Sequence, residues 1–106
     1  MPISRRKYGN KKTEVDGFKF DSKAEAARWL LLKVLSEIGL ISDLQRQVPY
    51  QIAINGVKVC KYVADFVYTE KGQQVVEDVK GFRTAEYRLK KKLMLAVHQI
   101  EIQEVK

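Results

Sequence analysis

Hydrophobic and polar residues alternate along much of the chain between residues 44 and 80. This alternation predicts β-strands, because successive side chains of a strand point to opposite faces of a sheet. Three such runs follow one another: Leu44–Ile54, Val57–Tyr68 and Gln74–Lys80. Asn55-Gly56 and Lys71-Gly72 separate the runs and favour tight turns. We therefore expect an antiparallel three-stranded meander, with Pro49 placing the first strand at a sheet edge.

Two segments carry apolar residues at the three- and four-residue spacing of an α-helix. The first is predicted over Ser22–Ile38, where Ser22 and Glu25 match a capping box and Gly39 is a natural stop. Its apolar stripe is predicted to pack on the sheet and consists of Ala27, Leu31, Val34, Leu35 and Ile38. Glu25 falls on the opposite side of this helix, which predicts that it lies outside the core.

The second helix is predicted over Ala85–His98, with Thr84 as its N-cap. Its apolar side consists of Leu89, Leu93, Ala96 and Val97. A short hairpin over Thr13–Phe20 precedes the first helix, and a short strand over Ile100–Val105 follows the second. A helix between two strands can form a right-handed crossover, so the last strand can pair parallel to an earlier one.

These elements predict one α/β domain over residues 13–106, with a central mixed β-sheet flanked by helices. Residues 1–12 are polar and basic, and we expect them to form a flexible N-terminal arm. The sequence contains no run of about 18 apolar residues, so we expect no membrane-spanning helix. The single cysteine, Cys60, cannot form an intramolecular disulfide and indicates a reducing cytoplasm.

The charges are segregated along the chain, which has 20 Lys and Arg, 13 Asp and Glu, and a net charge of +7. Positive residues concentrate near the N-terminus and in Lys80–Lys92, while Glu14–Asp78 is slightly acidic. This pattern suits a nucleic acid held at its phosphates, although solubility or an acidic partner would also account for positive charge. The candidate DNA-binding residues are Arg5, Arg6, Lys7, Lys11, Lys12, Arg83, Arg88, Lys90, Lys91 and Lys92.

Three ionisable residues lie within or beside apolar strand segments, where a charge costs free energy unless it is paired or holds a metal. Asp65 is surrounded by apolar residues, and Asp78 and Lys80 end the next strand. Side chains two apart on a strand share a face, so Asp78 and Lys80 are predicted to point the same way, and a hairpin could bring Asp65 beside them. Neighbouring carboxylates favour a hard cation such as Mg²⁺, and a nearby lysine can stabilise the transition state of phosphodiester hydrolysis.

This arrangement resembles the PD-(D/E)XK nuclease superfamily, in which an acid on one strand is followed by acid-x-Lys on the next. Asp65 and Asp78-Val79-Lys80 match that pattern, with Glu25 on the preceding helix. The segments that look like small phage and prophage nucleases are Phe20–Glu25, Ala64–Phe66, Val76–Gly81 and Lys90–Lys92. The layout is also similar to Holliday-junction resolving enzymes of the phage endonuclease I type. Two departures are Ala64 instead of proline before Asp65, and Asp78 where glutamate is more usual.

The resemblance implies a restriction-endonuclease-like core with the order α-β-β-β-α-β. It implies that Glu25, Asp65 and Asp78 bind Mg²⁺ directly or through water, and that Mn²⁺ can replace this ion. It also implies that Lys80 is the catalytic lysine and that Gln47 lines the site. The implied protein is a metal-dependent endodeoxyribonuclease of phage or prophage origin. It would act in the cytoplasm of a bacterial host, in DNA recombination or processing.

The sequence contains no recognition helix or zinc module that we can identify, so we expect selection of branched DNA rather than of a base sequence. Paired cuts would require a homodimer, because one chain offers one site. Two alternatives stay open: a nicking or end-processing nuclease without branch selectivity, and a non-catalytic DNA-binding module whose acids balance nearby lysines. Glu25 could also act only as a helix-capping acid. Glu77 is expected to face away from Asp78, either as a surface acid or as an acid that supports the site.

Overall fold

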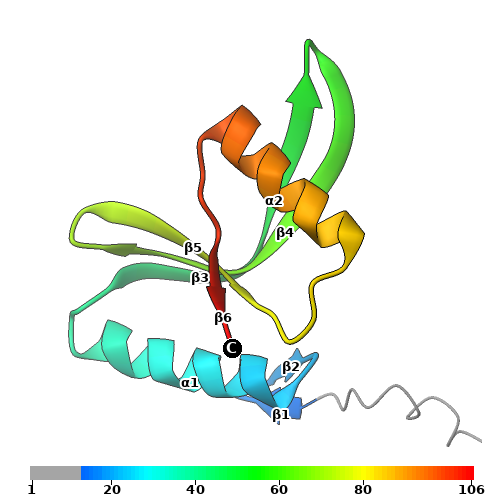
Figure 1. Cartoon of the computed structure of the whole chain (residues 1–106). Coiled ribbons are helices and arrows are strands. Elements are labelled where there is room, and N and C mark those ends of the chain that lie inside the picture. Colours follow the sequence, from blue (N-terminus) through cyan, green and yellow to red (C-terminus); the bar gives the residue numbers. More distant parts are fainter. Residues whose placement is uncertain (1–12) are drawn as a thin grey trace, which may run out of the picture.

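A four-stranded sheet with the order β3-β4-β5-β6 forms the centre of the molecule. The computed structural model describes residues 13–106 (Figure 1). The strands of the sheet are β3 (Ser42–Ile54), β4 (Val57–Glu70), β5 (Gln73–Val79) and β6 (Gln103–Val105). β3, β4 and β5 are antiparallel neighbours, whereas β6 pairs parallel to β5. The mixed sheet, the edge position of β3 and the parallel last strand are confirmed, and the predicted arm at residues 1–12 lies outside the described residues.

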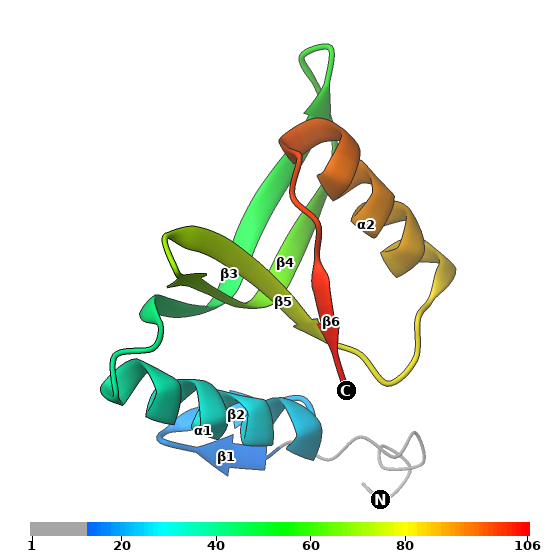
Figure 2. The same cartoon turned by 60° about the vertical axis from the view of Figure 1, so that its left-hand side comes forward.

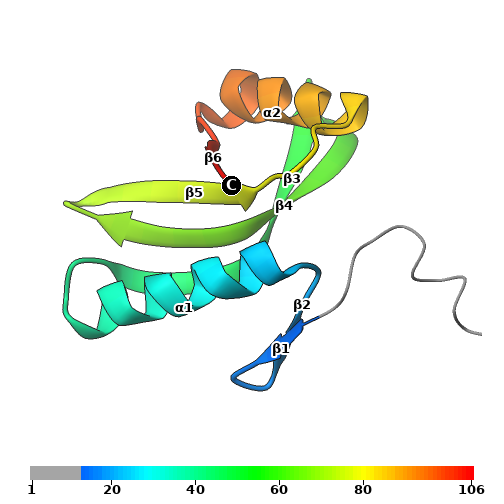
Figure 3. The ribbon, with the colours of Figure 1, turned by 60° about the horizontal axis from the view of Figure 1, so that its bottom comes forward.

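Two helices and a small hairpin complete the domain. They are α1 (Lys23–Glu37), α2 (Ala85–His98) and the hairpin of β1 (Thr13–Val15) and β2 (Phe18–Phe20). The two helices lie on opposite sides of the sheet, with α1 beneath β4 and β5 and α2 beside the β3–β4 hairpin (Figures 1 and 3). The order from α1 onward is therefore α-β-β-β-α-β, as predicted. No helix among residues 13–106 is long and apolar enough to cross a membrane.

The tight turns of all three hairpins are confirmed. In each turn, two consecutive residues have φ between +52° and +81°, the left-handed conformation that a type I′ turn requires. The turns are Asp16-Gly17, Asn55-Gly56 and Lys71-Gly72. Because these turns fix the register of the strands, they also determine which residues of β4 and β5 lie side by side.

β4 extends beyond β5, and this difference in length creates the candidate site. The first half of β4 pairs with β3 alone, whereas Phe66–Glu70 pair with β5 as well (Figure 2). Asp65 lies at the point where β4 and β5 diverge. Its neighbours Ala64 and Phe66 pack into different hydrophobic clusters, so β4 changes the face that it presents at this residue.

The two hydrophobic clusters lie on opposite sides of the sheet. The α2-side core consists of Ile52, Tyr62, Ala64, Val67, Val76, Tyr87, Met94 and Ile102. The α1-side core consists of Phe20, Ala26, Trp29, Leu32, Ile41, Phe66 and Tyr68. The large aromatic residues Trp29 and Tyr87 are both buried in these cores.

The predicted packing face of α1 is wrong. Leu31, Val34 and Ile38 are 47–64% exposed, Ala27 is exposed as well, and of the predicted stripe only Leu35 packs against the core. The buried face instead consists of Glu25, Ala26, Trp29 and Leu32. The physical reason is the large aromatic area of Trp29, whose ring stacks on Phe66 with centroids 6.1 Å apart.

The N-cap and bounds of α2 are confirmed, and its apolar face is confirmed in part. Thr84 accepts a hydrogen bond from Tyr87 N at 3.1 Å. Leu93 and Val97 pack against the α2-side core, but Leu89 and Ala96 are exposed. Tyr87 and Met94, seven residues apart, are the buried residues of this helix.

Candidate active site

Asp65 occupies the fork between β4 and β5. Its Oδ2 accepts a hydrogen bond from the backbone N–H of Val79 at 2.8 Å. The part of β4 that precedes Phe66 is not paired with β5, so this carboxylate supplies Val79 with the acceptor that a neighbouring strand would otherwise provide. The contact fixes the Asp65 carboxylate next to the residues that end β5.

Asp78 and Lys80 are brought together at the end of β5, as their spacing predicts. Asp78 is 3% exposed, and its Oδ2 accepts a hydrogen bond from the Tyr62 hydroxyl at 2.6 Å. Lys80 Nζ lies 3.0 Å from Asp78 Oδ1, an ion pair whose angles do not make a hydrogen bond. Asp78 Oδ1 is therefore a buried oxygen that accepts no hydrogen bond from residues 13–106.

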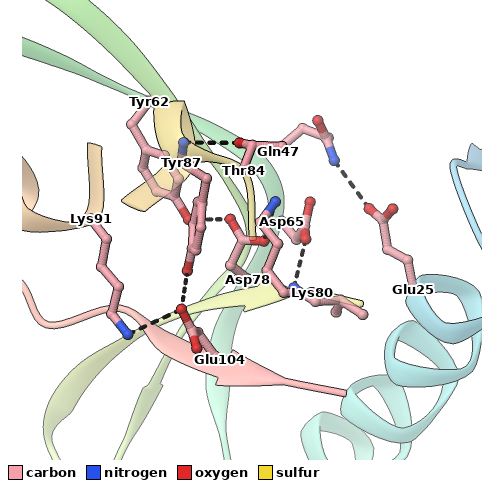
Figure 4. Close-up of polar contacts among 11 residues, drawn as sticks. Glu25, Gln47, Tyr62, Asp65, Asp78, Lys80, Thr84, Tyr87, Lys91 and Glu104 are labelled. Carbon is pink, nitrogen blue, oxygen red and sulfur yellow. Dashed lines mark hydrogen bonds and ion pairs between the residues drawn. The ribbon is translucent and has the colours of Figure 1, made fainter. Parts of the chain in front are cut away.

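Glu25 faces the sheet from α1, and the prediction that it lies outside the core is wrong. The residue is 5% exposed, because α1 buries the face that also carries Ala26 and Trp29. Ser22 accepts a hydrogen bond from Glu25 N at 3.1 Å, which confirms the N-cap. The Glu25 carboxylate accepts a hydrogen bond from Gln47 Nε2 at 3.2 Å and points into the same region as Asp65 and Asp78 (Figure 4).

Gln47 adopts an unusual backbone conformation for a strand residue. Its φ is +54°, within the left-handed region that residues other than glycine rarely adopt. Backbone strain of this kind costs of order 1–3 kcal/mol and often occurs at functional sites. The structure thus brings the Gln47 side chain to Glu25, one of the candidate site residues.

The three carboxylates influence one another electrostatically. Burial raises the pKa of Asp65 to about 7, a hydrogen bond from Val79 opposes this rise, and the charges of Asp78 and Glu25 add to it. Burial also raises the pKa of Glu25, with a smaller contribution from Asp78. A cation between these groups would favour their ionised forms, because an opposite charge offsets both burial and mutual repulsion.

The donor set fits Mg²⁺ better than a metal that needs a complete protein cage. No three His, Cys, Asp or Glu side chains within residues 13–106 form a group that could hold an ion by themselves. Mg²⁺ commonly uses only one or two carboxylates and completes its octahedron with waters and substrate phosphates. Asp65 and the buried oxygen of Asp78 that accepts no hydrogen bond could supply two such ligands from adjacent strands.

An open cleft of about 690 Å³ gives access to this region. Glu25, Asp65 and Lys80 line it, together with the loop residues Gly81 and Phe82. Asp78 borders a neighbouring hollow of about 250 Å³, which it shares with Tyr62 and Lys80. Lys80 lines both spaces, and its ammonium group contacts the buried carboxylate of Asp78.

Sequence reasoning missed two groups beside Asp78. Tyr62 donates to Asp78, and burial and that hydrogen bond together raise the pKa of the Tyr62 hydroxyl. Glu104 lies opposite Asp78 in the parallel β5–β6 pairing and accepts a hydrogen bond from the Tyr87 hydroxyl at 2.9 Å. Glu104 could have been found from a correct parallel register, whereas no local pattern connects Tyr62 with a residue on β5.

The candidate DNA-binding residues of the second basic block differ in their surroundings. Arg83 and Lys91 form ion pairs with Glu104 at 2.9 and 3.1 Å, and Lys90 pairs with Glu86 at 3.0 Å. Arg88 and Lys92 are exposed and have no ion-pair partner in the described part of the chain. The candidates of the first block, Arg5, Arg6, Lys7, Lys11 and Lys12, lie outside the described residues.

Glu77 does face away from Asp78, but the expectation that it could be a surface acid is wrong. It is buried on the α1 side of the sheet, where Arg28 donates two hydrogen bonds to it, at 2.9 and 2.6 Å. The Tyr68 hydroxyl donates a further hydrogen bond to the same carboxylate. This ion pair, in which Arg28 is half-buried, joins α1 to β5 and adds to the packing of Trp29 in turning this face of α1 to the sheet.

Comparisons with known proteins place the chain in a family without assigning it an activity. No curated protein matches it. A family model described as "Protein of unknown function (DUF1064)" matches residues 5–105, a range that includes Glu25, Asp65, Asp78 and Lys80. The chain therefore belongs to the DUF1064 family.

Proposed function

We propose that this protein is a Mg²⁺-dependent DNA endonuclease that hydrolyses phosphodiester bonds at the fork between β4 and β5. The observation that carries the proposal is the convergence of two acids and a lysine at that fork. Asp65 and Asp78 come from neighbouring strands, and Lys80 lies 3.0 Å from Asp78. Their arrangement supports the resemblance to PD-(D/E)XK nucleases, in which an acid and an acid-x-Lys pair lie at adjacent strand ends.

Each residue of the candidate site has a distinct role in the proposed hydrolysis. Asp65 and Asp78 would hold Mg²⁺, with Glu25 contributing through water. Bound there, Mg²⁺ would lower the pKa of a coordinated water and neutralise charge on a phosphate oxygen. Lys80 can exchange its contact with Asp78 for one with the phosphate, where it stabilises the negative charge that develops as water attacks. Gln47 and Tyr62 orient Glu25 and Asp78 through their hydrogen bonds.

DNA is the proposed substrate because basic residues surround the open cleft. Lys80 lines the cleft, and Arg83 and Arg88 border an adjoining hollow. Phosphate contacts of this kind give affinity without reading the base sequence. We therefore propose selection of branched DNA by its shape, in phage recombination or DNA processing in the bacterial cytoplasm, with a homodimer required for paired cuts.

A non-catalytic DNA-binding module is the second candidate. The observation that favours it is the ion pair between Lys80 and Asp78, which balances one of the buried acids without any metal. In such a module the acids would keep the strand ends neutral, and the basic residues would bind DNA.

A cleavage assay distinguishes the two functions. The purified protein is incubated with four-way, flapped, nicked and linear DNA in Mg²⁺ and in EDTA. We expect cutting only with Mg²⁺. Asp65→Asn, Asp78→Asn and Lys80→Ala should each lower the rate by at least about 100-fold and largely spare DNA binding. Glu70→Gln and Lys58→Ala are matched controls, because both residues are exposed on β4 away from the fork.

The outcomes have distinct meanings. Preference for branched DNA supports a junction-type nuclease, and equal cutting of all forms indicates a nicking or end-processing enzyme. Binding without cutting under any metal or pH would favour the non-catalytic module. Near-normal cutting by any one of the three variants would show that its residue is not catalytic.

A further inference from the structure

Phe82 is the most exposed large apolar residue in the described part of the chain. Its exposed fraction is 79%, and it belongs to neither hydrophobic core. Every aromatic pair that the structure shows among residues 13–106 involves other rings. Folding therefore gains little from this phenyl ring, which leaves its presence beside the cleft to be explained by binding.

The loop that carries Phe82 is held at both of its ends. This loop joins β5 to α2 and is yellow in Figure 1. Before Phe82, Lys80 N donates a hydrogen bond to Val105 O at 2.9 Å. After Phe82, the Arg83 side chain forms an ion pair with Glu104, and Thr84 caps α2. A ligand that uses Phe82 thus meets a loop that is already ordered, which lowers the entropy cost of binding.

Phe82 also borders the two spaces that a nucleic acid would occupy. It lines the open cleft with Asp65 and Lys80, where the proposed function puts the scissile phosphate. It lines the adjoining hollow with Arg83 and Arg88, whose guanidinium groups suit a neighbouring phosphate. The ring therefore borders both the proposed site of the scissile phosphate and the adjoining hollow that Arg83 and Arg88 line.

We propose that Phe82 stacks on an unpaired base next to the scissile phosphate, so that the preferred substrate is DNA with an unstacked nucleotide at a flap, gap or branch. This inference rests on the proposed function and adds the feature that selects the substrate. The bases of an intact duplex already stack on one another, and only an unpaired base offers its face to a protein ring. Stacking accepts any base, because every base has a π-face.

Binding measurements in EDTA test the stacking separately from cleavage. The probes are a duplex with a single-stranded flap and a fully paired duplex of the same length. Phe82→Ala should weaken binding of the flapped DNA by roughly 10-fold, within the range for loss of one base–aromatic stack. Phe82→Leu should weaken it similarly, since leucine keeps apolar volume without a flat ring. Phe82→Tyr should retain the affinity, and binding of the paired duplex should change little in all three variants.

Fluorescence of Phe82→Trp gives a second readout. The introduced indole should be quenched by the flapped DNA and not by the paired duplex, while Trp29 is buried and provides a constant background. For the binding measurements, Val57→Ala is the matched control, because Val57 is an exposed apolar residue at the β3–β4 turn. Circular dichroism checks that each variant is folded.

The results separate the two proposals. If the protein cuts DNA but Phe82→Ala and Phe82→Leu bind flapped DNA like the wild type, the stacking proposal is wrong and the nuclease proposal stands. If the flap preference depends on Phe82 but no DNA is ever cut, the stacking is supported and the hydrolytic function fails. Equal loss of affinity for flapped and paired DNA would also overturn the stacking proposal.

Discussion

At the scale of single residues, the candidate site is organised around charges that do not favour folding. Asp65 is half-buried, and its pKa is raised to about 7 by that burial and by the charges of Asp78 and Glu25. Asp78 leaves a buried oxygen without a hydrogen-bond donor from residues 13–106. Such groups reduce the free energy of unfolding, so their presence is explained better by chemistry than by stability.

The raised pKa of Asp65 predicts a pH-dependent gain in stability when its charge is removed. The folded-state pKa is about 7 and the ordinary value is 3.8, so the folded protein binds the proton more tightly than the unfolded chain. The resulting stabilisation is complete below pH 4 and is lost as the pH rises through 7. Without metal, Asp65→Asn should therefore raise the free energy of unfolding at pH 8 by about 1–3 kcal/mol, and much less at pH 4.

Urea unfolding in EDTA at the two pH values measures this difference. Asparagine keeps an oxygen that can accept the hydrogen bond from Val79, so the variant changes mainly the charge. A gain of equal size at pH 4 and pH 8 would show that the Asp65 charge is not the cause.

At the scale of elements, the sequence predicted the positions of the strands more accurately than the buried faces of the helices. Alternation and turn dipeptides identified β3, β4 and β5, because strand patterns and type I′ turns are local properties. The spacing of Asp78 and Lys80 on one strand likewise placed both at the site. The buried face of α1 was not predictable in this way, since counting aliphatic residues gives no weight to Trp29 or to the Arg28–Glu77 pair. Tyr62 and Glu104 were missed because their contacts join distant segments.

Two adjacent leucines test which face of α1 is buried. Leu32 is fully buried, whereas Leu31 is 47% exposed. Leu32→Ala should lower the free energy of unfolding by about 2–5 kcal/mol, because it removes buried methyl groups and leaves a cavity. Leu31→Ala, the matched control, should cost less than about 1 kcal/mol, since it leaves no enclosed cavity. Thermal or urea unfolding gives both values. A larger loss of stability in Leu31→Ala than in Leu32→Ala would show that α1 buries the face expected from the sequence.

At the scale of the whole molecule, acidic and basic groups occupy different places. The acids Glu25, Asp65 and Asp78 lie near the fork where β4 and β5 diverge. The basic residues of the described part are most numerous along the loop after β5 and along α2. Long-range attraction would bring a polyanion to the basic surface, and the fork would then meet one of its phosphates. In the proposed nuclease, this arrangement would separate the surface that binds DNA from the site that cuts it.

This separation predicts how individual basic residues affect binding. Arg88→Ala and Lys92→Ala should each reduce the slope of log affinity against log salt by about 1, because neither side chain has an ion-pair partner within residues 13–106. Lys90→Ala should change the slope less, since Lys90 pairs with Glu86. Lys58→Ala on β4 serves as the control. Fluorescence anisotropy over a range of salt concentrations measures the slopes, and an unchanged slope would remove that residue from the DNA surface.

The proposed nuclease requires that Asp65 and Asp78 share a divalent ion. Anomalous diffraction from crystals soaked in Mn²⁺ would locate that ion. We expect a peak within about 2.0–2.3 Å of a carboxylate oxygen from each residue. We also expect that the peak is lost in Asp78→Asn and kept in the control Glu70→Gln. Bound Mn²⁺ at other acids only, or no ion while Lys80 stays on Asp78, would contradict this requirement.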